Sequence, residues 1–198
     1  LITVDAGRLW RADQEGVFQS VDSDVLNSRI PGYLRHPDGH WFGLSKRARV
    51  IAYNSSLELP ESFADYEDLA NEFFKGKVCM RSSSNIYNLS LMASVIDAHG
   101  VDIAENWARS VVANFARRPQ SNDTGQLRAV ASGECEITVA NTYYLGRLVS
   151  SNKLKDKETM AKLKIIFPNQ DNRGTHINIS GAGITRYAPN KENAIRFL

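Results

Sequence analysis

Hydrophobic residues follow two different spacings along the chain, and the two kinds of stretch alternate. Short apolar and β-branched runs predict strands, whereas apolar residues three or four positions apart predict amphipathic helices. Strands are predicted at Leu1–Val4, Trp41–Ser45, Arg49–Tyr53, Val78–Arg81, Glu136–Ala140, Leu163–Phe167 and His176–Ser180. Helices are predicted at residues 8–14, 61–74, 86–99, 101–116, 125–132 and 189–198, and directly after Asn141–Tyr144. This alternation is typical of an α/β fold with a largely parallel sheet.

Three turns follow predicted strands and lead into predicted helices. They are Asp5–Gly7, Ser82–Tyr87 and Asn141–Tyr144. In open α/β folds, ligands bind beyond the carboxyl ends of strands, where the next helices begin. We therefore expect a binding site to be built from these turns, two of which carry a tyrosine at the start of a helix.

The Tyr143-Tyr144 pair is the most informative of these features. Deprotonated phenols are hard oxygen donors suited to a trivalent cation such as Fe³⁺. Because a free tyrosine has a pKa near 10, ionisation needs a metal or a nearby cation. Arg147 follows on the same face of the predicted helix and could supply that charge. Packing of one ring and surface exposure of the other is the alternative interpretation.

Charge and motifs exclude several other functions. Lysine plus arginine total 24 and aspartate plus glutamate total 22, without the basic stripe of a nucleic-acid-binding domain. No apolar run approaches the roughly 20 residues of a membrane-spanning helix. The four histidines lack zinc-site spacing, and we interpret His36 and His40 as part of an exposed hairpin loop. No nucleophile motif or phosphate-binding loop occurs.

Two smaller features leave alternatives open. The serines Ser82–Ser84, at a predicted helix start, could bind an anion through backbone N–H groups or could simply cap the helix. Cys79 and Cys135 each precede a tyrosine-bearing turn, and we expect them to lie on neighbouring strands within disulfide distance. A buried pair of free thiols is the alternative.

Three segments together resemble one known family. They are Gly43–Asn54, Gly76–Asn88 and Asn141–Arg147, which carry GLSKRARVIAYN, GKVCMRSSSNIYN and NTYYLGR. This set resembles the ferric-iron-binding periplasmic proteins of ABC transporters, most of all their cyanobacterial FutA type, along essentially the whole chain.

The resemblance implies a type II periplasmic-binding-protein fold, an α/β fold with two lobes joined by crossover strands. Lobe one would comprise residues 1–48 and 176–198, and lobe two residues 49–175. The chain has no initiator Met, so we expect it to be an internal portion that lacks the N-terminal part of lobe one. A further iron ligand of that lobe would lie before Leu1.

The resemblance also implies the function. Tyr87, Tyr143 and Tyr144 would bind Fe³⁺ as phenolates in the cleft between the lobes. Arg47, Arg147, Asp5 and Ser84 would surround those ligands. The protein would be a periplasmic monomer without enzymatic turnover, and would deliver iron to the permease of an ABC importer in the inner membrane. It would not bind nucleic acid.

Two other functions remain as alternatives. A receptor of the same fold for a small anion or organic acid would use Ser82–Ser84 and Arg147 on its ligand, leaving the tyrosines to pack. An enzyme on this scaffold is the second alternative, but the sequence offers no nucleophile–base pair to support it.

Overall fold

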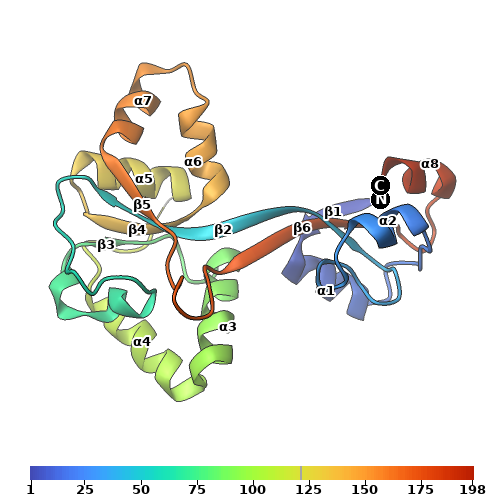
Figure 1. Cartoon of the computed structure of the whole chain (residues 1–198), viewed down its shortest axis with the longest axis horizontal. Coiled ribbons are helices and arrows are strands. Elements are labelled where there is room, and N and C mark those ends of the chain that lie inside the picture. Colours follow the sequence, from blue (N-terminus) through green and yellow to red (C-terminus); the bar gives the residue numbers. More distant parts are fainter. Residues whose placement is uncertain (121) are drawn as a thin grey trace. The chain divides into compact units, whose positions relative to one another are not determined.

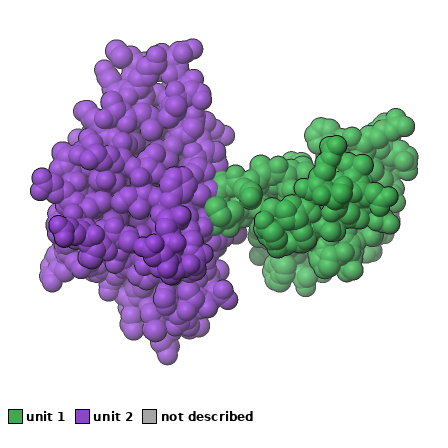
Figure 2. Space-filling view, in the orientation of Figure 1, with its two compact units in different colours: residues 1–47, 177–198 green, residues 48–176 purple. Residues whose placement is uncertain are grey.

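The computed structural model describes residues 1–120 and 122–198, which form two compact units. Unit 1 comprises residues 1–47 and 177–198, and unit 2 comprises residues 48–176 (Figure 2). Strand β2 (Phe42–Asn54) belongs to both units, because its first residues lie in unit 1 and the rest in unit 2. In the described part of the chain, no helix is long and apolar enough to cross a membrane.

Unit 1 is built on the antiparallel pair of β1 (Ile2–Asp5) and β6 (Ile177–Gly183), with Ile2 opposite Gly183 and Asp5 opposite Ser180. The start of β2 lies on the other side of β6. Three helices complete the unit: α1 (Ala6–Gln14), α2 (Asp24–Arg29) and α8 (Lys191–Phe197) (Figure 1). A 3-10 turn at Gly32–Leu34 precedes β2. The core of unit 1 contains the buried side chains of Val21, Leu26, Phe42 and Ile184.

Unit 2 contains a sheet in which β2 pairs antiparallel with both β4 (Ile137–Asn141) and β5 (Leu163–Ile166). The short β3 (Val78–Cys79) pairs parallel with β4. The prediction of a largely parallel sheet, made from the alternation of elements, is therefore wrong. The β3–β4 pair is nevertheless the one on which the tyrosine-bearing turns depend.

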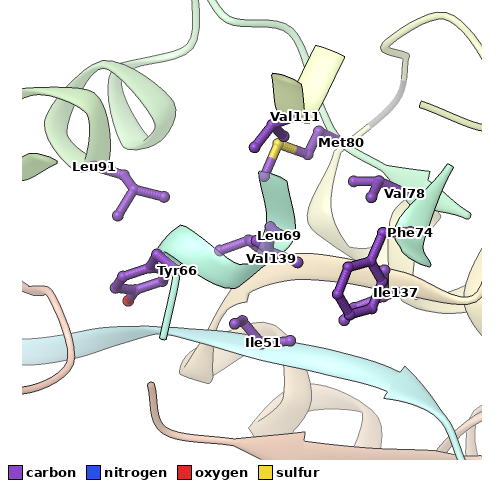
Figure 3. Packing of buried hydrophobic residues seen from close by; sticks show 10 residues of the cluster. All are labelled: Ile51, Tyr66, Leu69, Phe74, Val78, Met80, Leu91, Val111, Ile137 and Val139. Atoms are coloured by element: carbon purple, nitrogen blue, oxygen red, sulfur yellow. The ribbon is translucent and has the colours of Figure 1, made fainter. Parts of the chain in front are cut away.

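Helices cover both faces of this sheet (Figure 1). One face carries α3 (Ile86–His99), α4 (Val101–Ala113) and the 3-10 turns Glu67–Ala70 and Glu72–Phe74. The other face carries α5 (Asp123–Ser132), α6 (Thr142–Val149) and α7 (Leu154–Ala161). Alternation along β2 divides the core, because Ile51 packs on the first face whereas Val50 and Ala52 pack on the second. Figure 3 shows Ile51, Ile137 and Val139 extending from the sheet toward Leu69 and Phe74.

Two segments of the chain differ most from the predicted elements. The separate strands at Trp41–Ser45 and Arg49–Tyr53 are one continuous strand, β2. The helix predicted at residues 61–74 is replaced by two 3-10 turns, because the Asp68 carboxylate accepts hydrogen bonds from the amides of Ala64 and Asp65, both at 2.8 Å. Such side-chain bonds to the backbone compete with helical pairing.

Cys79 and Cys135 form a disulfide, with their Cα atoms 5.9 Å apart. This confirms that the two cysteines lie within bridging distance, and it removes the alternative of free thiols. Cys79 ends β3, whereas Cys135 lies just before β4 rather than within it. The bond closes a loop with a sequence separation of 56 residues beside the buried Ala129 and Val130 of α5.

Candidate metal centre

Two neighbouring parallel strands place the tyrosine-bearing helices at one edge of the sheet in unit 2. Val78 and Cys79 of β3 lie opposite Ile137 and Thr138 of β4. Helix α3 follows β3 and helix α6 follows β4, so both helices begin beyond the same ends of the strands. Tyr87 is therefore brought to Tyr143 and Tyr144 although more than fifty residues separate them in the sequence.

The three tyrosine rings form a contiguous cluster. The ring centres of Tyr143 and Tyr144 lie 4.4 Å apart, and those of Tyr87 and Tyr143 lie 6.5 Å apart in an edge-to-face arrangement. All three side chains are partly buried. The side chains of Tyr144 and Tyr87 also lie close enough to that of Tyr143 to raise its pKa. The structure thus brings together three phenol oxygens that the sequence separates.

The environment of Tyr143 keeps its phenol protonated. Burial raises the pKa of Tyr143 well above its ordinary value, and the interactions with Tyr144 and Tyr87 raise it further. A 3.5 Å hydrogen bond from the Asn141 side-chain amide to the hydroxyl oxygen opposes this effect without overcoming it. A high positive charge close to the oxygens is therefore needed to turn this cluster into a set of phenolates.

Arg147 lies beside the tyrosine pair, one helical turn further along α6. Its guanidinium carbon is 5.3 Å from the centre of the Tyr143 ring and 5.7 Å from that of Tyr144. The residue is exposed to solvent, so its charge is partly screened. The expected proximity of Arg147 to the tyrosines is present in the structure.

A second arginine, Arg81, lies closer to the interior of the cluster. It follows β3, and its guanidinium carbon is 5.0 Å from the centre of the Tyr87 ring. Burial lowers the pKa of Arg81, but the charge of Asp123, the interaction with Tyr144 and the hydrogen bond to Asp123 outweigh this effect and raise it. Arg81 thus stays charged while it touches two of the three tyrosines.

Arg81 is held by a buried ion network. The Asp123 carboxylate, which is fully buried, accepts hydrogen bonds from Arg81 at 3.1 Å and from Arg49 at 2.5 Å. Arg49 also donates to the side-chain oxygen of Asn88 at 2.6 Å. Since two guanidinium groups share one carboxylate, the network carries a net positive charge directly behind the tyrosine cluster.

The residues that begin the two helices are held in different ways, and only Asn141 joins this network. Asn85 caps α3 by accepting a hydrogen bond from the Tyr87 amide at 3.0 Å. Asn141 occupies the corresponding position of α6 but makes no side-chain capping bond. Its backbone amide donates to Asp123 at 3.0 Å instead, and its side chain contacts Tyr143. The start of α6 is thereby fixed by the site itself rather than by a local cap.

Sequence reasoning missed Arg49, Arg81 and Asp123. In the sequence Asp123 stands out only as a residue just before the helix predicted at residues 125–132, because its partners are 74 and 42 residues away. Arg81 was placed inside a predicted strand, whereas β3 ends at Cys79 and leaves Arg81 in the turn. Its position beyond the end of a strand and before the Tyr87 helix was the available signal.

The remaining predicted site residues are Ser84, Asp5 and Arg47. Ser84 is exposed, and its hydroxyl lies 2.8 Å from that of Ser82. Asp5 and Arg47 belong to unit 1. Asp5 caps α1 and pairs with Arg8, whereas Arg47 donates to the Ser180 hydroxyl at 2.6 Å. Their roles around a metal stay predictions.

Comparison with known proteins identifies the family of this chain. Residues 2–198 match the model of a family described as bacterial extracellular solute-binding protein. The chain belongs to this family of solute-binding proteins. Its fold is that of the type II periplasmic binding proteins, as the resemblance implied.

Several members of this family are similar along the whole chain. Iron uptake protein A1 of Synechocystis sp. is 52% identical over 198 residues, which cover 100% of this chain and 55% of that protein. The structure of Trichodesmium FutA in complex with iron and citrate is 55% identical, with a TM-score of 0.92 over 98% of this chain and 61% of that one. Apo FutA2 from Synechocystis gives 49% identity and a TM-score of 0.91 over 98% of this chain and 62% of that one. The chain therefore spans between about half and three fifths of the length of these relatives.

Proposed function

We propose that this chain supplies the tyrosine ligands of a ferric-iron-binding protein of the periplasm. Tyr87, Tyr143 and Tyr144 bind Fe³⁺ as phenolates, and the protein delivers the ion to the permease of an ABC importer. The observation that carries the proposal is the convergence of three phenols beside Arg81 and Arg147. The names of the relatives, which describe iron uptake and ferric iron binding, support the choice of cargo.

The charges of the cluster favour a trivalent ion. Three phenolates carry three negative charges, which Fe³⁺ balances and Fe²⁺ does not. The positive charge of Arg147 and of the Arg49–Arg81–Asp123 network lowers the cost of forming the phenolates. The positive charge of these arginines also repels Fe³⁺. Ferric affinity therefore depends on all three phenols losing their protons when the metal binds.

Ferric titration of the full-length protein tests this proposal. The parent is loaded from ferric citrate while the phenolate-to-iron charge-transfer absorption is followed. Tyr143→Phe and Tyr144→Phe keep the rings and remove one oxygen donor each. We expect each change to lower ferric affinity by more than about 100-fold, because loss of an outer-sphere partner alone costs roughly 10–100-fold.

A matched control is available in unit 1. Tyr187 is 88% exposed, so Tyr187→Phe should leave both the affinity and the absorption band unchanged. Parental affinity in Tyr143→Phe and Tyr144→Phe would contradict tyrosine ligation. A colourless protein whose melting temperature rises with citrate or phosphate, and whose ligand binding is lost in Arg147→Ala, would support an anion receptor instead.

A further inference from the structure

Three side chains with metal-binding atoms lie close together in unit 1: Asp13, His36 and His40. None of them is near a residue of the tyrosine cluster in the sequence. His40 Nδ1 lies 2.6 Å from one carboxylate oxygen of Asp13, and His36 Nε2 lies 3.2 Å from the other. The two imidazole rings stack with their centres 4.4 Å apart and their planes within 8°. Both histidines do lie in a hairpin turn, since Arg35 pairs antiparallel with Phe42, but they are not simply exposed: each is partly buried and faces a carboxylate.

We propose that Asp13, His36 and His40 form a second metal site, which binds a divalent transition-metal ion of the Zn²⁺ type. One ligand atom from each side chain lies within 4.8 Å of the other two. Tetrahedral zinc, with bonds of about 2.0–2.1 Å, needs donor atoms roughly 3.3 Å apart. Small side-chain rotations therefore bring these atoms to the distances that a shared ion requires.

The backbone fixes the donors before any ion binds. Asp13 lies in the last turn of α1, whereas His36 and His40 flank a turn that closes with a hydrogen bond from the His36 amide to the Trp41 carbonyl at 2.9 Å. A neighbouring segment holds this turn, since the Val21 amide donates to the Gly39 carbonyl at 3.1 Å and the Ser20 hydroxyl donates to the Asp38 carbonyl at 2.6 Å.

Gly39 allows this close approach between the turn and its neighbouring segment. Its φ is +71°, and an added Cβ would lie 2.3 Å from the carbonyl oxygen of Val21. A residue with a side chain would push the turn away and separate His36 and His40 from Asp13. The geometry of the turn therefore depends on a glycine at this position.

Proton positions are compatible with ion binding. In the structure the Asp38 amide donates to His36 Nδ1 at 3.1 Å, so the ring proton of neutral His36 is on Nε2, facing Asp13. A bound ion takes the place of that proton, which moves through water to Nδ1, and the exposed Asp38 amide then donates to water. His40 undergoes the same exchange between its two nitrogens.

The donor set selects the class of ion. Two neutral imidazoles and one carboxylate suit Zn²⁺, Cu²⁺ or Ni²⁺, whereas Mg²⁺ and Ca²⁺ prefer oxygen donors only. The single negative charge suits a divalent ion better than Fe³⁺. Asp13 is 12% exposed and His40 is 32% exposed, which leaves room for water to complete the coordination. The carboxylate also lies at the unfavourable negative end of the α1 dipole, which a cation offsets.

The test is a titration of the full-length, iron-free protein with ZnCl₂, measured by calorimetry. We expect one zinc ion to bind in the parent. His36→Gln and His40→Gln should each weaken binding by more than about tenfold. His99→Gln is the matched control, because His99 Nε2 lies 2.9 Å from Glu67 but belongs to no group of three metal-binding side chains in the described residues.

Two further measurements keep the outcome decisive. A Tyr143→Phe/Tyr144→Phe variant should keep its zinc affinity, which separates this site from the proposed ferric site. Should a histidine variant fail to fold, the imidazole resonances of His36 and His40 are followed in the parent, and both should shift on addition of zinc. Parental zinc affinity in His36→Gln and His40→Gln, or resonances that do not move, would show a hydrogen-bonded cluster only and would overturn the proposal.

Discussion

The guanidinium carbon of Arg81 lies 5.0 Å from the centre of the Tyr87 ring, and the interaction of the same side chain with Tyr144 contributes to the raised pKa of Arg81. Arg81 therefore connects a tyrosine of α3 with a tyrosine of α6. Only 14% of its side chain is exposed, whereas Arg147 is on the surface. Electrostatic effects on the phenols should accordingly be larger from Arg81, because solvent screens the charge of Arg147.

Arg81→Gln should weaken ferric binding about 10–100-fold, as is typical for partners that orient and polarise metal ligands. Arg147→Gln should weaken it less, by less than about tenfold, because the charge that it removes is exposed to water. Ferric titrations of the two variants measure the difference. Arg81→Lys, which keeps the charge but not the planar donor set, should fall between Arg81→Gln and the parent. A larger loss in Arg147→Gln than in Arg81→Gln would contradict this ranking.

Ferric affinity should rise with pH, because the metal must displace protons from the phenols. Burial raises the pKa of Tyr143 above the ordinary value near 10, so the iron-free protein keeps this proton throughout the neutral range. Each proton released on binding makes the affinity about tenfold higher per pH unit. Competition with citrate at several pH values, corrected for ferric hydrolysis, measures the slope. A flat profile would mean that no phenol ionises.

The same shift affects the stability of the iron-free protein. In the unfolded chain Tyr143 ionises near pH 10, whereas in the folded protein it does not until higher pH. The contribution of this group is therefore fully present below pH ~10 and is lost as the pH rises above that value. Tyr143→Phe removes the contribution, so its unfolding free energy should fall less steeply in alkali than that of the parent. Denaturant titrations at a series of alkaline pH values compare the two proteins.

Asp123 should contribute strongly to the stability of unit 2. It is fully buried and lies between Arg49 and Arg81. Asp123→Asn leaves two buried guanidinium groups without a counter-charge, which should cost about 3–5 kcal/mol of unfolding free energy. Glu105, paired with Arg109 on the exposed face of α4, is the control, and Glu105→Gln should cost less than about 1 kcal/mol. Equal losses in the two variants, measured by denaturant unfolding, would argue against the importance of the network.

The sequence indicates the convergence of the tyrosine-bearing turns better than it indicates the pairing of the strands. The two tyrosine-bearing turns could be found because each lies between an apolar strand and an amphipathic helix, and both signals are local. The pairing of β2 with β4 and β5 is antiparallel and joins residues far apart in the sequence, so alternation of elements did not indicate it. Lys46 and Arg47 lie in the gap between the two predicted strands, but the structure accommodates both in β2, Lys46 exposed and Arg47 buried.

The metal-binding cluster of unit 1 could not be predicted from spacing. His36 and His40 are four residues apart, but Asp13 is 23 residues before His36 on a different element. The contact depends on the turn around Gly39 packing against Val21, and a contact of this kind leaves no periodic signal in the sequence. Similarly, Asp123 has the sequence signature of a helix start, while its partners are known only from the fold.

The disulfide between Cys79 and Cys135 should stabilise unit 2 without controlling ferric affinity. Its loop, with a sequence separation of 56 residues, should contribute about 2–4 kcal/mol to the free energy of unfolding, chiefly by restricting the unfolded chain. The β3–β4 pairing and the packing of Val130 remain without it, so the tyrosine turns should keep their positions. The double variant Cys79→Ala/Cys135→Ala should therefore unfold at a lower denaturant concentration than the parent. Its ferric affinity should change by less than about tenfold, which is the smallest loss expected when a partner of a metal ligand is displaced. Treatment of the parent with a reductant should reproduce the loss of stability but should not affect the double variant, which has no disulfide to reduce. An equal response of both proteins to the reductant would show that the bond contributes nothing to stability.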